Sequence, residues 1–360
     1  MSLYRSIIRP IIFKLPAETV HEVGLKTLKF ALTSKSIQNF AADRFETGEF
    51  GDLERFGLIF KNPVGLAAGF DKNGLVVNQL ASLGFGFVEV GTVTYEPQPG
   101  NPKPRLFRLP DDEALINRLG FNNDGALVVA ERLKKLSRKC VVGVNIGRNK
   151  DIPNEKATEH YLQSLELVHP VADYIAVNIS SPNTPNLREL QKTARFEELL
   201  LCLETRNREL GRKPLLVKIA PDLTESEVEM IVAVCMERSI AGIISTNTTI
   251  ERSGLKTKDA ARFGAGGLSG RPLAKRSTDV ISIIYRYSKG KLPIIGVGGI
   301  FTAEDAFAKI AAGASLIQAY TGFIYHGPAF ARYINSGLLG ILKERGFATL
   351  DDAIGSGHIY

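Results

Sequence analysis

The stretch from Asn178 to Pro185, Asn-Ile-Ser-Ser-Pro-Asn-Thr-Pro, packs two amides, two serines and a threonine into its first seven residues. It follows the apolar run Tyr174 to Val177, which is typical of a buried parallel strand. Polar side chains at the end of such a strand are well placed for chemistry. The alternative is a turn in which serine and asparagine bond to the local backbone and the prolines fix the bend.

A general base is hard to find in this sequence. No cysteine and no histidine falls at the end of an expected strand; the histidines are His21, His160, His169, His326 and His358. Ser181 is therefore the best candidate for a proton acceptor, although an unaided serine is a poor base and needs a proton relay or a charged intermediate beside it. The lack of a His–Asp partner argues against a hydrolase triad.

Two lysines add positive charge to the candidate site. Lys218 lies in the otherwise apolar run Leu215 to Ala220, where an unpaired ammonium would be costly unless it met an anion or a polarised carbonyl. Lys72 follows the apolar run Val64 to Ala68. The alternatives are an internal ion pair for Lys218 and a solvated loop position for Lys72.

Asparagines offer both a donor and an acceptor. The candidates near expected strand ends are Asn117, Asn145, Asn178, Asn183 and Asn247. Such a set suits a flat, neutral heterocycle with alternating N–H and C=O groups, for example a pyrimidine-like ring whose carboxylate pairs with Lys72. Each asparagine taken singly is more often a turn or cap residue.

Two glycine-rich segments suit a phosphate. They are Pro293 to Ile300, followed by Thr302-Ala-Glu-Asp, and Ala311 to Ser315. Glycines let the backbone approach a ligand closely, and the amides at the start of a helix favour an anion. The alternative is that the glycines serve close packing between strand and helix.

The elements that must position these residues alternate regularly. Short apolar runs are separated by segments of helix length, such as Thr224 to Arg238 and Thr302 to Ala312, which open with an N-cap pattern. Eight runs are strand candidates: Val64–Ala68, Phe87–Gly91, Val141–Ile146, Tyr174–Val177, Leu215–Ile219, Gly242–Ser245, Pro293–Gly296 and Leu316–Ala319. Eight β/α units in about 260 residues predict an α/β protein with a TIM (β/α)8 barrel rather than a doubly wound sheet, whose dinucleotide fingerprint is absent.

In a TIM barrel the functional residues lie at the carboxyl ends of the strands. Polar or glycine residues end or follow all eight runs: Gly69 to Lys72, Thr92, Asn145, Asn178 to Asn183, Lys218, Thr246 to Thr248, Gly298 to Gly299, and Tyr320 to Thr321. This repeated pattern favours a functional role for the stretch from Asn178 to Pro185 over a simple turn.

Residues 1–40 differ from the rest and carry six Lys/Arg against two Asp/Glu. Apolar residues recur at helical spacing from Tyr4 to Leu15, where Pro10 should kink the helix or delay its start, and a second helix is expected from Pro16. These amphipathic helices suit a cap on the main domain, an anionic lipid surface, or both. With a polar linker expected around Asp43 to Glu54, we divide the chain into an N-terminal helical extension (1–45), a barrel domain (46–345) and a tail (346–360).

The composition is that of a globular protein, with 44% hydrophobic and 23% charged residues among 360. A net charge of +7 suits an anionic surface or an acidic small substrate, but the lack of tryptophan and of an arginine-rich stripe interleaved with aromatics argues against nucleic acid. The three widely separated cysteines predict a reducing compartment and no structural metal. No apolar run approaches the ~18 residues that a membrane-spanning helix needs.

Eight motifs occur in an order that is informative as a set. They are Gly65-Leu-Ala-Ala-Gly-Phe-Asp-Lys72, Glu89-Val-Gly-Thr92, Pro104-Arg-Leu-Phe-Arg108, Ile116-Asn-Arg-Leu-Gly-Phe-Asn122, Asn178-Ile-Ser-Ser-Pro-Asn-Thr184, Val217-Lys-Ile-Ala-Pro-Asp222, Ser245-Thr-Asn-Thr-Thr249 and Gly266-Gly-Leu-Ser-Gly-Arg-Pro272. In these motifs the chain closely resembles the membrane-associated, quinone-linked class of dihydroorotate dehydrogenases, and it does so more loosely over the N-terminal helices.

The resemblance implies an FMN-dependent barrel that oxidises (S)-dihydroorotate to orotate in pyrimidine (UMP) biosynthesis and passes electrons to a membrane quinone. It implies FMN contacts at Ala68, Gly69, Phe70, Asp71, Lys72, Thr92, Asn145, Asn178, Lys218, Thr246, Gly270, Gly299, Tyr320 and Thr321. It implies orotate contacts at Lys72, Asn117, Arg118, Leu119, Gly120, Phe121, Asn178, Asn183, Asn247 and Thr248.

The resemblance also implies roles in the reaction. Ser181 would take the substrate proton while hydride goes to the flavin, Lys218 would stabilise the reduced flavin, and Thr184 and Phe121 would line a relay to water. Serine rather than cysteine at this position separates the quinone-linked class from the soluble class. In the family the N-terminal helices form a quinone tunnel, whose polar residues His21 and Arg108 match; the alternatives are a helix-face histidine and a surface arginine.

The expected location is peripheral, on the cytoplasmic side of a bacterial inner membrane, because no mitochondrial-type presequence or spanning helix is visible, and a monomer is expected. Two other interpretations stay open. One is another FMN barrel, either a soluble dihydroorotate dehydrogenase or an enzyme acting on uridines in tRNA, against which Ser181 and the N-terminal extension count. The other is a non-catalytic barrel that binds a phosphorylated metabolite and joins a membrane complex, which a yellow purified protein would exclude.

Overall fold

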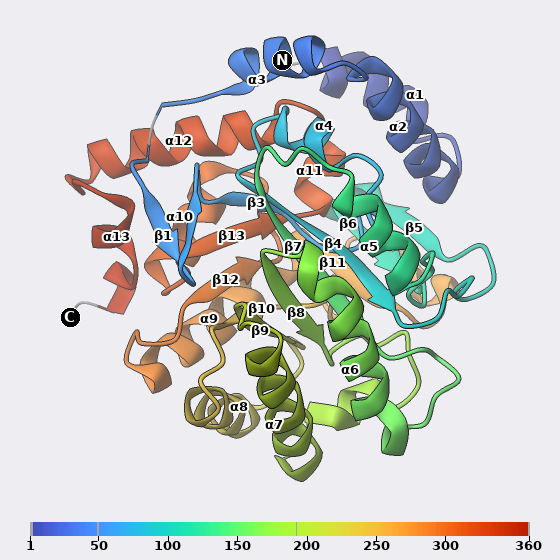
Figure 1. The fold of residues 1–360 in the computed structure, drawn as a ribbon. Coiled ribbons are helices and arrows are strands. Elements are labelled where there is room, and N and C mark those ends of the chain that lie inside the picture. Colours follow the sequence, from blue (N-terminus) through green and yellow to red (C-terminus); the bar gives the residue numbers. More distant parts are fainter. Residues whose placement is uncertain (1–2, 49, 192, 359–360) are drawn as a thin grey trace.

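The computed structural model describes residues 3–48, 50–191 and 193–358, and its centre is a closed barrel of eight parallel strands (Figure 1). The strands are β3 (Val64–Leu66), β4 (Phe87–Thr94), β7 (Val141–Gly147), β8 (Tyr174–Asn178), β9 (Leu215–Ile219), β10 (Gly242–Ser245), β12 (Ile294–Val297) and β13 (Leu316–Ala319). Each pairs with its neighbours along the chain, and β13 pairs with β3 to close the ring. The predicted (β/α)8 barrel is confirmed, with β3 two residues shorter and β4 three residues longer than expected.

Helices surround the barrel because each strand run is followed by an amphipathic segment whose apolar face packs on the strands. The expected N-caps are present: Thr224 and Thr302 each accept a hydrogen bond from the amide three residues on, in complete capping boxes. The helices that follow the barrel strands are α4 (Val77–Ala81), α5 (Ala126–Lys134), α6 (Ala157–Val168), α7 (Thr193–Glu209), α8 (Glu225–Glu237), α9 (Ala274–Ser288), α10 (Ala303–Ala311), α11 (Thr321–His326) and α12 (Phe330–Glu344).

Two small sheets flank the barrel. The hairpin β1 (Leu53–Arg55) and β2 (Leu58–Phe60) covers the end at which the strands begin, where the Phe60 ring meets Phe87 at 5.2 Å. A three-stranded antiparallel sheet lies near the opposite end; its strands are β5 (Leu106–Leu109), β6 (Ala114–Asn117) and β11 (Gly267–Gly270). No local pattern in the sequence predicts this second sheet, because its pairing joins segments about 150 residues apart, as the Asn117 to Gly267 pair shows.

The N-terminal segment forms four short to medium helices along one edge of the molecule (Figure 1). They are a π-helical turn (Tyr4–Ile8), α1 (Arg9–Ile12), α2 (Ala17–Ala31) and α3 (Lys35–Phe45). Helical backbone already runs through Tyr4–Ile8 as wider π turns, so Pro10, in the first turn of α1, does not delay the helix, whereas α2 follows Pro16 as expected. The predicted linker from Asp43 is wrong at its start, because α3, capped by the Ser34 side chain, extends to Phe45.

The chain ends with α13 (Leu350–Ala353) and a 3₁₀ turn (Ser356–His358), which pack on the barrel through a stack of His358 on Tyr285 at 5.1 Å. The division into extension, barrel and tail stays a prediction, and its residues 1, 2, 359 and 360 lie outside the described residues. Among the described residues no helix is both long and apolar enough to cross a membrane. In the same part of the chain no group of His, Cys, Asp and Glu could hold a metal ion.

Candidate active site

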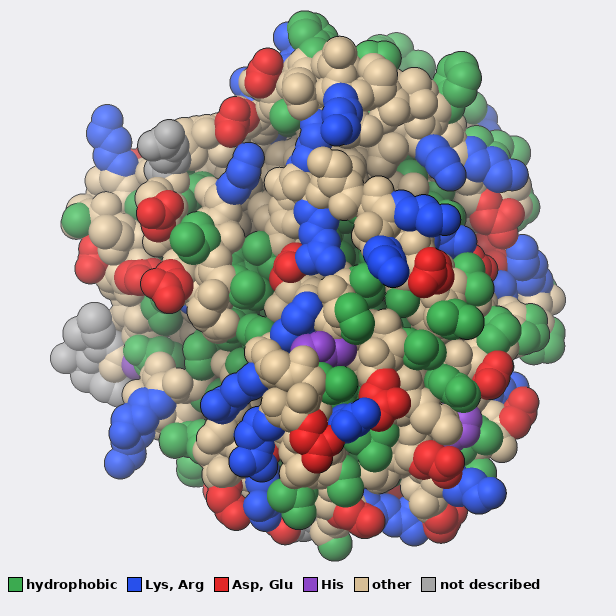
Figure 2. Space-filling model, viewed as in Figure 1, with side chains coloured by type: hydrophobic (Ala, Val, Ile, Leu, Met, Phe, Trp, Pro, Cys, Tyr) green, Lys and Arg blue, Asp and Glu red, His purple; other side chains and the backbone are tan. Residues whose placement is uncertain are grey.

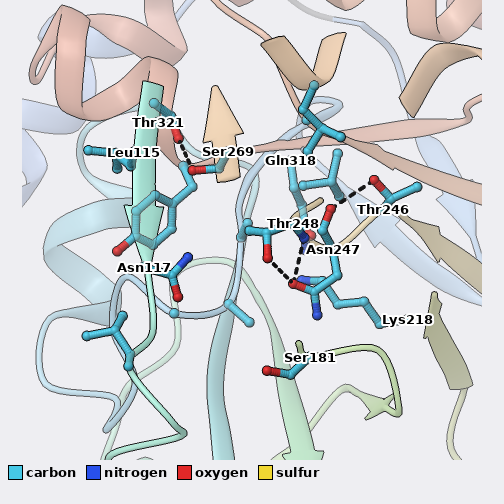
Figure 3. A pocket seen from close by; sticks show the side chains of 18 of the residues that line it. Leu115, Asn117, Ser181, Lys218, Thr246, Asn247, Thr248, Ser269, Gln318 and Thr321 are labelled. Atoms are coloured by element: carbon cyan, nitrogen blue, oxygen red, sulfur yellow. Dashed lines mark hydrogen bonds between the residues drawn. The ribbon is translucent and has the colours of Figure 1, made fainter. Parts of the chain in front are cut away.

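A cavity opens at the carboxyl ends of the barrel strands and is bounded on one side by the small sheet of β5, β6 and β11 (Figure 3). Its empty space, including the part open to solvent, is about 1040 Å³. Most of the predicted site residues line it: Ala68, Gly69, Lys72, Thr92, Asn117, Leu119, Gly120, Phe121, Asn178, Ser181, Asn183, Lys218, Thr246, Asn247, Thr248, Gly270, Gly299, Tyr320 and Thr321. Residues that were predicted from their positions at strand ends therefore line one cavity, although they come from distant parts of the sequence.

Other predicted residues lie behind the cavity wall. Asp71 is fully buried and accepts hydrogen bonds from the amides of Leu75 and Val76, both at 2.8 Å, so it holds the turn after β3. Arg118 turns away and donates to the carbonyls of Pro104 and Ala265. Phe70, Asn145, Thr184, His21 and Arg108 also lie outside the lining.

Polar side chains at the ends of β4, β7 and β8 form one connected network. The Thr92 hydroxyl donates to Asn145 Oδ1 (2.5 Å) and accepts from Asn178 Nδ2 (2.9 Å). Asn247 Nδ2 donates to Asn178 Oδ1 (3.2 Å). Asn145 does not line the cavity, but its hydrogen bond orients the Thr92 hydroxyl, which does. The network also determines which amide atoms of Asn178 and Asn247 can face a ligand.

Ser181 is 5% exposed and lines the cavity on the loop after β8. Its Oγ accepts a hydrogen bond from the amide of Asn183 (3.2 Å), and within the described chain neither an imidazole nor a carboxylate bonds to it. The Thr184 hydroxyl is buried and has no hydrogen-bond partner among the described residues. An unpartnered buried hydroxyl near a candidate proton acceptor fits a relay that is completed by solvent.

Amides and a lysine surround the part of the cavity next to the small sheet. Asn183 Nδ2 donates to Asn117 Oδ1 (3.1 Å), and Lys72 Nζ donates to Asn122 Oδ1 (2.6 Å). Burial, and secondarily the charge of Arg105, lower the pKa of Lys72 to about 7, while Glu18 opposes this shift. In Figure 3 Asn117 stands on one side of the cavity and Lys218 on the other, with Ser181 between them at the lower edge.

The glycine turns show both of the roles considered for them. Gly299 lines the cavity, and at its φ of +70° an added Cβ would lie 2.4 Å from the Ala274 Cα, so the glycine is also required for packing against α9. Nearby, the hydroxyls of Ser269 and Thr321 are 2.9 Å apart, also on the cavity wall. The described lining contains the two lysines Lys72 and Lys218 and no carboxylate, which favours an anionic ligand.

The comparisons with known proteins agree on one family. The family model described as dihydroorotate dehydrogenase matches residues 52–342. A Christiangramia forsetii protein named "Dihydroorotate dehydrogenase (quinone)" is 51% identical over 340 residues, which cover 94% of this chain and 99% of the relative. A Roseiflexus protein of the same name is 49% identical, with 98% of each chain covered. This chain belongs to the dihydroorotate dehydrogenase family.

A solved structure of a dihydroorotate dehydrogenase supports the same assignment at the level of the fold. The crystal structure of DHODH from Eimeria tenella in complex with ferulenol matches with a TM-score of 0.84 and 39% identity, over 95% of this chain and 96% of that one. The ligand-free Eimeria structure gives 0.81 at 41% identity, over 90% and 98%. Because the match covers nearly the whole chain, it includes more than the barrel alone.

The two residues expected to bind a quinone, His21 and Arg108, lie on the N-terminal helix α2 and on β5. The His21 ring on α2 meets the Phe70 ring edge-on at 4.9 Å, and Phe70 meets Tyr320, which lines the cavity, at 5.9 Å. Burial, and next the charge of Lys72, lower the pKa of His21 to about 4, so His21 is neutral at pH 7. Arg108 on β5 donates to the Leu15 carbonyl (2.8 Å) and lies over the Phe13 ring at 4.6 Å.

Two parts of this dihydroorotate dehydrogenase site were missed in the sequence. Glu89 on β4 forms an ion pair with Lys218 at 3.4 Å, so Lys218 both lines the cavity and has the internal partner considered as its alternative. Arg105 forms a forked ion pair with Glu18 on α2 at 2.8 to 3.2 Å. A carboxylate inside the apolar run from Phe87 was the visible signal for the first pair; nothing local indicated the second.

Proposed function

We propose that this chain oxidises (S)-dihydroorotate to orotate, with FMN as cofactor and a membrane quinone as electron acceptor, in de novo pyrimidine biosynthesis. The observation that carries the proposal is the match to relatives named "Dihydroorotate dehydrogenase (quinone)" along nearly the whole chain. A cavity that holds Ser181 and Lys218 at the strand ends supports it.

The lining of the cavity suits the chemistry of FMN. It offers apolar walls, two lysines and hydroxyls at its glycine-rich side. We assign FMN binding to the predicted set other than Phe70, Asp71 and Asn145, which lie behind the wall; Asn145 supports Thr92. When bound, FMN supplies the hydride acceptor.

The chain's own residues position the substrate and move its proton. Asn117, Asn178, Asn183 and Asn247 present amides that suit the alternating N–H and C=O groups of the ring, and Lys72 suits its carboxylate. Ser181 Oγ would accept the proton released from the substrate carbon next to the carbonyl. We propose that this proton then passes along a path lined by Thr184 and Phe121 to water.

Lys218 has a separate task in the proposed reaction. Its ammonium lines the cavity and is paired on the other side with Glu89 at 3.4 Å. A fixed positive charge in a site of low polarity favours a ligand that gains negative charge on reduction, without any rearrangement of solvent. The side chain is held for this purpose by the strand β9 that carries it.

The N-terminal helices are proposed to lead the quinone from the membrane to the cavity, where His21 and Arg108 would bind its carbonyls. Exposed apolar side chains concentrate here: Leu3 (65%), Ile7 (53%), Ile11 (60%), Phe30 (86%) and Phe40 (72%). Figure 2 shows hydrophobic and basic side chains at the upper edge, where Figure 1 places these helices. Such a surface suits anionic lipid.

From these features we infer a peripheral protein on the cytoplasmic side of a bacterial inner membrane, acting as a monomer. The three cysteines, all in the described part of the chain, are free thiols, which suits a reducing compartment. The lipid-facing assignment rests on the exposed side chains of the π-helical turn, α1, α2 and α3.

The proposed function is tested by anaerobic reduction of the bound cofactor. Purified protein should be yellow, dihydroorotate should bleach its flavin absorption band, and one orotate should form for each flavin reduced. A colourless protein that still binds phosphorylated metabolites would favour the non-catalytic barrel, and a yellow protein that dihydroorotate fails to bleach would contradict the substrate.

A further inference from the structure

Glu89 is a fully buried carboxylate inside the barrel, and four strands contribute a donor to it. Lys218 Nζ (3.4 Å) and Asn145 Nδ2 (2.8 Å) donate to Oε1. Gln318 Nε2 (2.8 Å) and the Tyr174 hydroxyl (3.1 Å) donate to Oε2. Burial, followed by the charge of Glu89, raises the pKa of Tyr174 well above its ordinary value, so Tyr174 remains a neutral donor. The roles described above for catalysis and binding leave this carboxylate without a function.

Glu89 itself does not line the cavity, but its hydrogen-bond partners connect it to residues that do. Lys218 and Gln318 are both part of the cavity wall, and Figure 3 shows them there. Asn145 accepts from Thr92, which is a third wall residue. Glu89 is therefore one side chain below the cavity, on the far side of the ammonium that faces the ligand.

We propose that Glu89 is a positioning residue that sets the reduction potential of the bound flavin by holding Lys218 in place and offsetting part of its charge. The inference rests on the proposed function, because it requires a flavin in the cavity. A buried charge acts over several ångströms with little screening, so the carboxylate opposes the gain of negative charge in the space above it. Lys218 alone would favour the reduced ligand more strongly.

This balance matters for an enzyme that must give its electrons away again. A cavity that stabilised the reduced state too strongly would take electrons from the substrate readily but would transfer them poorly to an acceptor. The pair Glu89 and Lys218 leaves a local net charge near zero below the cavity while keeping a cationic donor at its surface. Removing the carboxylate should therefore favour the reduced state of the flavin.

The structure also indicates that Glu89→Gln can be accommodated. Gln318 Oε1 is buried and has no hydrogen-bond partner among the described residues. If the Gln318 amide rotates, this oxygen can accept from the new amide at position 89, and the Tyr174 hydroxyl can serve as donor or acceptor. The charge can then be removed while most hydrogen bonds are kept.

The test measures the midpoint potential of the flavin-loaded protein by dye-linked reduction under anaerobic conditions. Glu89→Gln should make reduction at least tenfold more favourable, which raises the potential by about 30 mV for a two-electron couple. Tyr174→Phe is the matched control, because it removes one hydrogen bond from the same carboxylate but leaves the charge; it should change the equilibrium less than threefold. A Glu89→Gln shift below threefold, or a lower potential, would overturn the inference.

A second variant keeps the inference testable if Glu89→Gln does not retain flavin. The double variant Glu89→Gln/Gln318→Glu keeps the same charge and polar atoms but moves the carboxylate to position 318, which lines the cavity. Its potential should fall below that of the unchanged protein, and an unchanged or higher potential would refute the role of the charge. An unchanged protein that binds no flavin would overturn the proposed function and this inference together, whereas a failure of the shifts alone would leave the proposed function intact.

Discussion

Ser181 lies in the cavity without an imidazole or carboxylate bonded to it in the described chain, and its proton must leave along a route that includes solvent. The buried Thr184 hydroxyl, which has no hydrogen-bond partner among the described residues, is consistent with such a route. An unaided serine is a poor base and needs a proton relay or a charged intermediate beside it. Because it acts in the proton-transfer step, its contribution should appear in the rate of flavin reduction and not in binding.

Ser181→Ala should slow flavin reduction by dihydroorotate by on the order of 10²-fold or more, the usual scale for a lost general base, while FMN is retained. Stopped-flow absorbance under anaerobic conditions measures this rate directly. Ser180→Ala is the neighbouring control: its hydroxyl faces Asn178 and Asn247 at 3.1 and 3.0 Å and is not in the cavity wall. If the Ser180 variant were the slower of the two, the base would have been assigned to the wrong serine.

Lys72 gives the site a pH dependence. Because burial, with help from Arg105, lowers its pKa to about 7, the fraction of protonated Lys72 falls as pH rises above that value. A carboxylate ligand binds the protonated form, so the orotate dissociation constant should be level below about pH 7 and rise toward tenfold per pH unit above it. Orotate titration followed by the flavin spectrum measures this, and Lys72→Met should bind more weakly with a flat profile. A flat profile in the unchanged protein would remove Lys72 from carboxylate binding.

Much of the site could be predicted because polar residues at strand ends need no knowledge of distant contacts. Asn178, Lys218 and Asn247 follow directly from the strand-end rule. Glu89 was visible as a charge within an apolar run, but its pairing with Lys218 depends on two strands that are not adjacent in the barrel. For Asp71 the family resemblance suggested a ligand contact, yet the side chain holds its own loop, because two backbone amides lie within reach.

At the scale of elements, Arg105 joins the N-terminal helices to the loop around Pro99 and Asn101, which bonds to the backbone next to the cavity wall. Its guanidinium bonds to Glu18 on α2 and donates to the carbonyls of Pro99 and Asn101 at 2.6 and 2.7 Å. Asn101 Nδ2 in turn donates to the Arg118 carbonyl (2.9 Å), next to the wall residues Leu119 and Gly120. Both side chains of the pair are largely buried, at 7% and 14% exposed.

Glu18→Gln should loosen α2, because it leaves the buried Arg105 charge without its anionic partner at a cost of about 3 kcal/mol, the lower end of the range for buried pairs. Hydrogen exchange of the Ala17–Ala31 amides should accelerate accordingly. The control is Glu22→Gln on the same helix, whose pair with Lys103 is 53% and 59% exposed and should change protection by less than about 0.5 kcal/mol. Equal protection in the two variants would contradict the anchoring role of Arg105.

The Glu18 pair also has a pH signature. Burial raises the pKa of Glu18, but the hydrogen bonds and charge of Arg105, with Lys103 and Lys72, more than offset this and leave the pKa below its ordinary value. A depressed carboxyl pKa contributes stability above the unfolded value, and that contribution is lost as pH falls through the folded value. Acid should therefore release α2 before it affects a barrel strand.

Helices and strands whose formation depends on their own sequence could be predicted, whereas those that depend on distant contacts could not. Strands such as β9 and helix α2 follow from apolar runs and periodicity, and α8 from the capping box at Thr224. Helix α3 was not predicted, and its last residues from Asp43 were assigned to a linker, because its burial, as at Gln38 and Ala41, comes from contacts that the sequence does not display. The small sheet was missed for the same reason: β11 pairs with β6 across about 150 residues.

At the scale of the whole molecule, the barrel places the cavity near its strand ends, with the N-terminal helices beside it (Figure 1). Electrons entering at the substrate side would leave toward α2, where the rings of Tyr320, Phe70 and His21 form a continuous contact. This arrangement separates the amide-rich part of the cavity, where the substrate is proposed to bind, from an apolar side toward the exposed hydrophobic residues of the N-terminal helices. We therefore expect a polar substrate to be oxidised on one side and an apolar electron acceptor to be reduced on the other.

The choice of electron acceptor tests this account most directly. With dihydroorotate as donor, a soluble quinone should support steady formation of orotate, while fumarate or NAD in its place should support none, and Ser181→Ala should reduce the quinone-dependent rate. Orotate formation with each acceptor, at equal enzyme concentration, decides the question. Turnover with fumarate equal to that with quinone would contradict the assignment to the quinone-linked class.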